Sequence, residues 1–173
     1  MAEGLLRRRL TDVGIDARVS SAGSWRADCA ASPEAVEVLA RRGIDIGPHR
    51  SRLLSRELLE DVDLVLAMQR RHLREAVALD PATMPIAFTL KELVRRGEAV
   101  GPRGETSLEE WLARAADGRR AGDLLGENEA DDVADPIGLG LAQYEATASE
   151  LEDLIDRLVH LLWGPVREEA GQA

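Results

Sequence analysis

Apolar residues recur every three or four positions in several stretches of the chain, a spacing that predicts amphipathic helices. The longest such stretch lies near the C-terminus, where Gly164-Pro165 ends a 4-3-4-3-4 pattern of Tyr144, Ala148, Leu151, Ile155, Leu158 and Leu162. Ser32-Pro33 predicts the start of another helix, because serine caps helices and proline suits the first helical position. Further helices are expected at residues 2–13, 55–59, 69–79 and 107–117, and the glycines and proline of residues 97–104 predict a loop.

Three shorter segments have the composition of β-strands. Residues 62–68 are almost continuously apolar, as expected for a strand that helices cover on both faces. Residues 17–22 are a second candidate that leads into a turn at Gly23, and residues 84–89 are a third, in which Pro85 favours a sheet edge. Because predicted strands and helices alternate along the chain, we expect the α/β class, with a parallel sheet flanked by helices.

The size and composition of the chain fit one globular domain. Of its 173 residues, 45% are hydrophobic and 31% are charged. We expect the domain to span residues 1–165 and residues 166–173 to form a tail. No stretch approaches the roughly 18 uninterrupted apolar residues that a membrane helix needs, and the arginine-bearing N-terminal stretch is not an export signal. We therefore expect a soluble, cytoplasmic protein that does not act at a membrane.

The distribution of charge bears on possible partners. The formal net charge is −10, and residues 1–86 contain 13 basic and 13 acidic residues, so the remainder holds 9 bases against 19 acids. This balance provides no general basic face for nucleic acid, although a local arginine cluster could hold one phosphate group. Residues 123–135 contain six acids and no base. Such a run predicts a solvated loop.

Cysteine and histidine are too sparse to indicate redox or metal chemistry. Cys29 is the single cysteine, which excludes a disulfide or a thiol relay within these residues. His49, His72 and His160 lie in different predicted segments and lack the i, i+4 spacing of a helical metal site. We therefore predict no metal ion and no cofactor.

Several short segments, in their order and spacing, resemble the low-molecular-weight protein-tyrosine-phosphatase family. They are Met1-Ala2-Glu3-Gly4-Leu5-Leu6, Ser20-Ser21-Ala22-Gly23, Arg42-Gly43-Ile44-Asp45, His49-Arg50-Ser51, Ala67-Met68 and Asp135-Pro136. The resemblance covers almost the full length of the chain. It implies one α/β domain with a four-stranded parallel sheet, and hydrolysis of phosphomonoesters through a cysteinyl-phosphate intermediate.

The family's nucleophile has no counterpart among these residues. In that family a C-x5-R-S loop between the first strand and the first helix supplies the thiolate, the phosphate-binding arginine and the loop amides. Met1-Ala2-Glu3 matches the residues that follow this loop, so we expect the loop and the first central strand to lie upstream. The strand at residues 62–68 would then lack a neighbour. Cys29 does not replace the nucleophile, because Ala35 stands six residues later, where an arginine is required.

The resemblance assigns roles to three residues. Asp135 matches the general acid, which protonates the leaving oxygen and then activates water; without the family, Asp-Pro indicates a turn or a helix start. Ser21 matches a serine whose hydroxyl supports the phosphate loop, and is otherwise a strand-end hydroxyl. Trp25 matches the region that forms one aromatic wall of the substrate cleft, and is otherwise a partly buried core residue. Many relatives have an aromatic residue directly after Asp-Pro, where this chain has Ile137-Gly138, so a phosphoester other than phosphotyrosine is possible.

Three interpretations of function follow. The first is a phosphomonoester hydrolase acting on a phosphorylated protein or a small phosphoester, with an internal methionine taken as the start, so that the 173 residues alone are inactive. The second is a non-catalytic interaction module or a decayed gene product. The third is a thiol-dependent arsenate reductase, although an intramolecular relay would need further cysteines.

Overall fold

The sheet of the protein is short and parallel. The computed structural model describes residues 1–120, 122 and 129–164. Strand β1 (Val65–Ala67) pairs with β2 (Ala87–Thr89) in parallel, with Leu66 opposite Phe88. Helix α3 (Arg70–Leu79) and the 3-10 turn η1 (Pro81–Thr83) connect the two strands. This strand-helix-strand crossover confirms the predicted α/β class and the parallel sheet.

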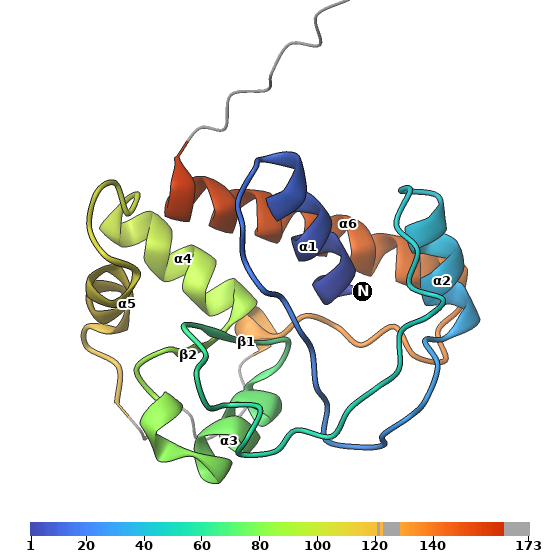
Figure 1. The fold of residues 1–173 in the computed structure, drawn as a ribbon, viewed down its shortest axis with the longest axis horizontal. Helices are drawn as coiled ribbons and strands as arrows, with labels where there is room; N and C mark the ends of the chain where they lie inside the picture. Colours follow the sequence, from blue (N-terminus) through green and yellow to red (C-terminus); the bar gives the residue numbers. More distant parts are fainter. Residues whose placement is uncertain (121, 123–128, 165–173) are drawn as a thin grey trace, which may run out of the picture.

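The other helices of the described residues enclose the larger apolar core. They are α1 (Ala2–Asp12), α2 (Pro33–Ala40), α4 (Leu90–Val100), α5 (Leu108–Ala116), the 3-10 turn η3 (Glu129–Asp131) and α6 (Leu141–Trp163). Helix α6 runs across one side of the molecule, and α1, α2 and α4 pack against it (Figure 1). The six residues of the predicted C-terminal stripe are all buried. Among the described helices, none combines the length and the apolar character of a bilayer-spanning segment.

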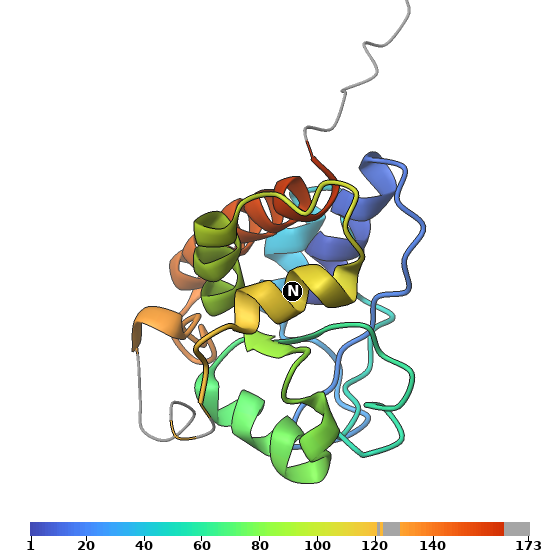
Figure 2. The same cartoon turned by 90° about the vertical axis from the view of Figure 1, so that its left-hand side faces the viewer.

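Side chains of the sheet alternate between two apolar clusters, as the two-residue period of a strand requires. Ala67 and Ala87 pack with Leu73 of α3, whereas Leu66 and Phe88 belong to the larger core with α1 and α6. In two perpendicular views α3 lies on one side of the sheet and α6 on the other (Figures 1 and 2). The sheet is therefore flanked by helices, as predicted.

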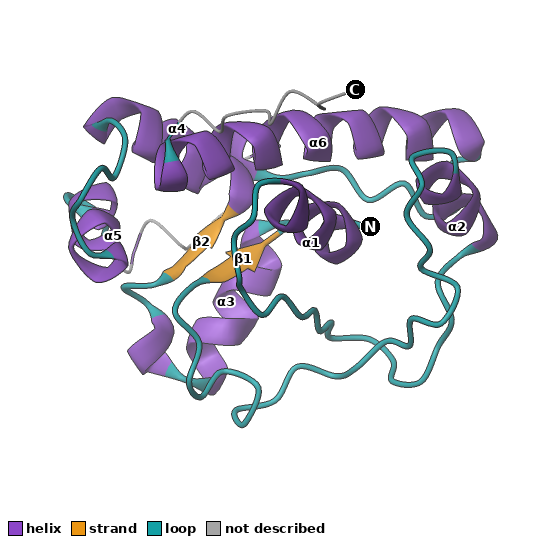
Figure 3. Cartoon of the chain, turned by 45° about the horizontal axis from the view of Figure 1, so that its top comes forward, coloured by secondary structure: helices purple, strands orange, loops and turns teal. Residues whose placement is uncertain are grey.

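Several predicted features differ from the structure. Residues 17–22 form no strand, because no described segment pairs with them beyond an isolated bridge between Gly23 and Leu53. Residues 55–59 form hydrogen-bonded turns instead of a helix, since so short a segment does not repay the cost of helix nucleation. The strand predicted at residues 62–68 does have a neighbour on one edge, β2. Long loops connect α1, α2 and β1 (Figure 3).

Helix α4 is the largest departure from the sequence prediction, since it includes residues 97–100, which were expected to be loop. The Thr89 hydroxyl caps its N-terminus by accepting a hydrogen bond from the Glu92 amide at 3.2 Å. Gly97 is buried in this helix against the Trp111 ring of α5 and Leu161 of α6. Glycine thus marks a close helix-helix contact here and not a break.

Substituting Gly97 with alanine is expected to lower the free energy of unfolding by about 1–2 kcal/mol. An added Cβ would lie 2.8 Å from the Trp111 ring and 2.9 Å from a Leu161 methyl group, and this overlap outweighs the better helix propensity of alanine. Urea unfolding measures the change. The double variant Gly97→Ala, Leu161→Ala should lose less than the sum of the single variants, because the shorter side chain relieves the overlap. A more stable Gly97→Ala protein would contradict the packing argument.

Helix α5 belongs to an excursion, residues 101–120, that is fastened to the core. Trp111 is fully buried, and its Nε1 donates to the carbonyl oxygen of Gly101 at 2.9 Å. Arg103 Nε donates to the carbonyl oxygen of Leu162 at 2.8 Å. Ser107 and Glu110 form a reciprocal capping box at the start of the helix. The excursion is therefore packed, with its own cap and its own buried anchor.

Candidate active site

Asp135 lies in an exposed turn between η3 and α6, at the end of residues 131–135, here called the acid segment. Its Oδ1 accepts a hydrogen bond from the Ile137 amide at 3.1 Å. Pro136, directly after it, is buried. A turn of this kind fixes an aspartate side chain relative to its own backbone. The carboxyl group is therefore oriented and at the same time accessible to a substrate.

The acid segment is bound to the carboxyl end of β1. The Val133 amide donates to the carbonyl oxygen of Met68 at 2.8 Å, and Gln69 Nε2 donates to the carbonyl oxygen of Val133 at 3.3 Å. The Arg70 amide donates to Asp132 Oδ1 at 2.8 Å, so Asp132 satisfies the N-terminus of α3, where Gln69 makes no side-chain cap. The carboxyl ends of parallel strands are the usual place of ligand sites in α/β sheets.

Asp131 is 1% exposed and binds two arginines. Its Oδ2 lies 2.9 Å from Arg70 Nη2, and its Oδ1 lies 2.8 Å from Arg95 Nη2 on α4. Burial raises the pKa of Asp131, but the hydrogen bonds from Arg95 and Arg70 outweigh it and leave the pKa below its ordinary value. The prediction of a solvated loop over residues 123–135 is therefore wrong at Asp131, and residues 123–128 of that prediction lie outside the described residues.

His72, in the first turn of α3, lies within electrostatic reach of the acid segment. Burial and the neighbouring Arg71 lower the pKa of His72, whereas the carboxylates of Glu75, Asp135 and Asp132 act in the opposite direction. Because the net shift is downward, the ring is mainly neutral near neutral pH. It therefore does not add a full positive charge next to Asp135.

Ser21 is held by the N-terminal turn of α1. Its hydroxyl donates to the Glu3 carboxylate, which also pairs with Arg7 and lies 3.8 Å from His49 Nδ1. Burial raises the pKa of Glu3, but the hydrogen bonds from Ser21 and Arg7, with the nearby positive charge, outweigh it and lower the pKa. Arg52 Nη2 donates to the carbonyl oxygen of Ser21 at 2.9 Å. Both the side chain and the backbone of Ser21 are therefore fixed.

Trp25 is 74% exposed, which excludes its interpretation as a partly buried core residue. The Arg26 guanidinium lies 4.5 Å from the centre of its ring. The opposite wall of the predicted substrate cleft would follow Asp135. There Ile137 is 61% exposed, and the nearby Leu139 is 64% exposed. These three apolar side chains are available for contact with a substrate. Within the described residues, no hydrogen bond, ion pair or aromatic contact joins Asp135 directly to Ser21 or Trp25.

Cys29 lies outside the helices and strands of the structure. It is exposed in a loop, its amide donates to the Ser51 hydroxyl at 3.0 Å, and its Sγ lies 3.5 Å from the carbonyl oxygen of Ala27. Helix α2 begins four residues after Cys29, at Pro33, so the thiol does not lie at a helix N-terminus. The described residues also contain no group of three histidine, cysteine or acidic side chains that could hold a metal ion.

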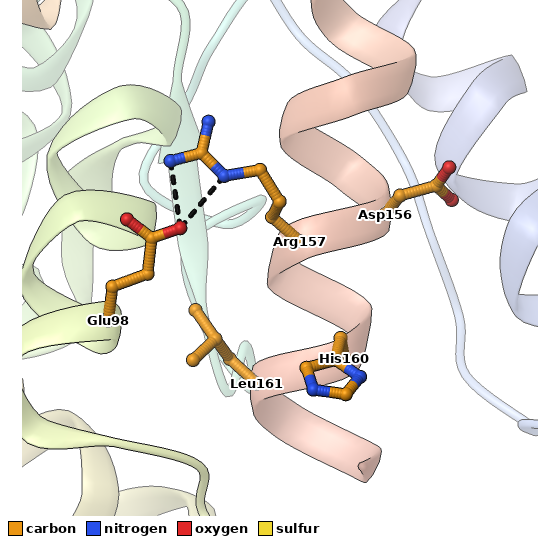
Figure 4. Close-up of a pocket in the computed structure, with 5 residues that line it drawn as sticks. All are labelled: Glu98, Asp156, Arg157, His160 and Leu161. Atoms are coloured by element: carbon orange, nitrogen blue, oxygen red, sulfur yellow. Dashed lines mark hydrogen bonds and ion pairs between the residues drawn. The ribbon is translucent and has the colours of Figure 1, made fainter. Parts of the chain in front are cut away.

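A surface depression is located far along α6 from the acid segment. It is lined by residues of α4 and α6, where Arg157 pairs with Glu98 at 2.8 Å, and Asp156 points away from this pair (Figure 4). His160 and Leu161 complete the lining. The lining residues that belong to α6 follow its first residue, Leu141, by at least fifteen positions, which corresponds to roughly 22 Å or more along the helix. The depression is therefore separate from the Asp135 turn.

The sequence of the chain matches a known protein family. Residues 1–99 match the model of the low molecular weight phosphotyrosine protein phosphatases. The chain belongs to this family. The match confirms the resemblance deduced from the short segments, and the solved phosphatase structures described next have the same α/β fold.

Individual phosphatases of the family cover different parts of the chain. A probable low molecular weight protein-tyrosine-phosphatase, EpsP of Ralstonia solanacearum, is 38% identical over 54% of this chain and 62% of its own length, so the chain aligns with less than two thirds of that relative. The protein-arginine-phosphatase of Bacillus subtilis is 31% identical over 94% of this chain and 87% of its own length. The crystal structure of a low molecular weight protein tyrosine phosphatase from T. tengcongensis superimposes with a TM-score of 0.69 at 35% identity, covering 93% of this chain and 88% of that one.

Proposed function

We propose that these residues form the acid-bearing part of a phosphomonoester hydrolase that works through a cysteinyl-phosphate intermediate, with Asp135 as the general acid. The observation that supports this most directly is the attachment of the acid segment to the end of β1 and the start of α3. Val133 is bound at the carboxyl end of β1, the end of a parallel sheet at which ligands usually bind, and the exposed carboxyl group of Asp135 follows two residues later. Membership of the phosphatase family supports the reaction class.

The proposed reaction has two steps. A thiolate attacks phosphorus, the bond to the leaving oxygen breaks, and Asp135 transfers its proton to that oxygen. The Asp135 carboxylate then takes a proton from water, which attacks phosphorus, releasing phosphate and the thiolate. Ser21 is proposed to support the loop that carries the thiolate. Cys29 is not that thiolate, so we propose that the 173 residues do not hydrolyse phosphoesters by themselves.

The proposed substrate is a phosphorylated protein. Trp25 would contact the substrate on one side and Ile137 on the other, and both are largely exposed. Because Ile137 offers an aliphatic surface instead of a stacking ring, it gives phosphotyrosine no second aromatic wall. The relative aligned over nearly the whole chain is named a protein-arginine-phosphatase, which makes phosphoarginine a specific second substrate to test.

The experiment compares two proteins: the 173-residue chain, and a catalytic form in which a strand and a C-x5-R-S loop precede Met1. Hydrolysis of p-nitrophenyl phosphate should be absent in the first and present in the second. Peptides carrying phosphotyrosine or phosphoarginine then define the substrate, and reduction of arsenate in the presence of external thiols tests the reductase interpretation. A catalytic form that binds phosphate but dephosphorylates none of these compounds would favour a non-catalytic interaction module.

A further inference from the structure

We propose that Asp131 is a positioning residue for Asp135, acting through the ion pairs that it forms with Arg70 and Arg95. The inference rests on the proposed role of Asp135 as the general acid. It goes beyond that role, because it requires two helices, α3 and α4, to hold the acid segment in place.

The contacts place Asp131 between two separate elements. Arg70 begins α3, whereas Arg95 lies in the middle of α4, and each approaches a different carboxylate oxygen at 2.9 and 2.8 Å. Neither arginine alone would fix the rotation of the carboxylate, but two donors on its two oxygens do. Since η3 ends at Asp131, this ion-pair cluster defines where the acid segment leaves the core.

The distance from the cluster to Asp135 is short and partly fixed. Val133, halfway along the acid segment, is held by hydrogen bonds at both its amide and its carbonyl oxygen. A chain extends at most about 3.6 Å per residue, so the Asp135 backbone lies within roughly 7 Å of this anchor. A shift of Asp131 and Val133 would therefore also move the Asp135 carboxyl group. A displacement of about 1 Å in a catalytic group can cost on the order of a hundredfold in rate.

Simple packing does not account for a charged residue at this position. A buried carboxylate with its partners is often replaceable by apolar residues of similar volume with no loss of stability. Asp131 is 1% exposed, and the Arg70 side chain is largely covered as well. An apolar side chain would fill this space, but it would not fix the segment to two arginines in one orientation. The Arg95 side chain is 59% exposed, so orientation of the acid segment is the proposed role of this charge.

The test uses Asp131→Asn in the catalytic form with two substrates that differ in their leaving group. Phenoxide is a strong base and needs a proton as it departs, whereas p-nitrophenoxide departs with little help. We expect kcat/KM to fall roughly 10- to 100-fold for phenyl phosphate and less than about threefold for p-nitrophenyl phosphate. Hydrogen exchange at the Val133 amide should become faster. Asp153→Asn, which neutralises an exposed aspartate that pairs with Arg157, is the control with the same change of charge and should alter neither the two kcat/KM values nor the exchange.

The same measurement in an Asp135→Asn background distinguishes positioning from a structural role. If Asp131 acts through Asp135, then Asp131→Asn should leave the remaining ratio of the two substrates unchanged in that background. An equal loss for both substrates, or unchanged exchange at Val133, would overturn the inference. If Asp135→Asn itself has no effect, the proposed function fails. Exchange at Val133 still reports separately whether Asp131 holds the segment.

Discussion

Asp135→Asn in the catalytic form is expected to reduce kcat/KM for phenyl phosphate by roughly 10²–10⁴. Asparagine has the same shape and can still accept the hydrogen bond from the Ile137 amide, but it has no carboxylic proton to give to the leaving oxygen. The loss should be smaller for p-nitrophenyl phosphate. Steady-state kinetics with the two esters measure both values.

Asp153→Asn provides the control for this substitution. Asp153 is an exposed aspartate on α6 that pairs with Arg157 of the same helix, so its amide variant changes charge by the same amount at a distance from the acid segment. Its activity should match that of the unsubstituted catalytic form. Equal rates for Asp135→Asn and Asp153→Asn with phenyl phosphate would show that another group supplies the proton.

Arg119→Met is expected to destabilise the fold by about 3–5 kcal/mol, the usual cost of removing one partner of a buried ion pair. The Arg119 side chain is 4% exposed, and its Nε lies 2.9 Å from Glu92 Oε1. Its Nη2 donates to the carbonyl oxygen of Ala87 at 2.9 Å, and its guanidinium lies 4.1 Å from the centre of the Phe88 ring. Burial lowers the pKa of Arg119 despite the attraction of Glu92. Urea denaturation measures the change in unfolding free energy.

The double variant Arg119→Met, Glu92→Gln separates the pair from the other contacts of the arginine. Without Arg119, the buried Glu92 carboxylate lacks one of its positive partners. Neutralising Glu92 removes that uncompensated buried charge and should restore part of the stability. Arg96 also lies 3.0 Å from Glu92, so the recovery should be partial. A loss below about 1 kcal/mol for Arg119→Met would mean that the site is as tolerant as an exposed pair.

The sequence predicts those parts of the protein that depend on local patterns. The stripe of α6, the Ser32 cap of α2 and the strand-helix-strand order of β1, α3 and β2 all follow from local patterns, and the structure has each of them. Ser32 accepts the hydrogen bond from the Ala35 amide at 3.3 Å. Such features need only residues that are near one another in the chain.

Features that depend on distant residues are not predictable in this way. Glycine at position 97 indicates a loop in sequence, but Trp111 and Leu161 make it a close-packing site in a helix. Asp131 belongs to an acidic run, and its burial becomes understandable only with Arg70 and Arg95 beside it. The spacing of thirty-six residues between Arg95 and Asp131 gives no periodic signal. By contrast, the proposal for Asp135 comes from the family resemblance, which marks its Asp-Pro dipeptide.

The independent anchoring of α5 also offers a practical route to observing the protein at work. Residues 104–106, at the tip of the excursion before the Ser107 cap, are all exposed. Exposed tips of this kind tolerate insertions and labels. A fluorophore attached there would report the detachment of α5 from the core.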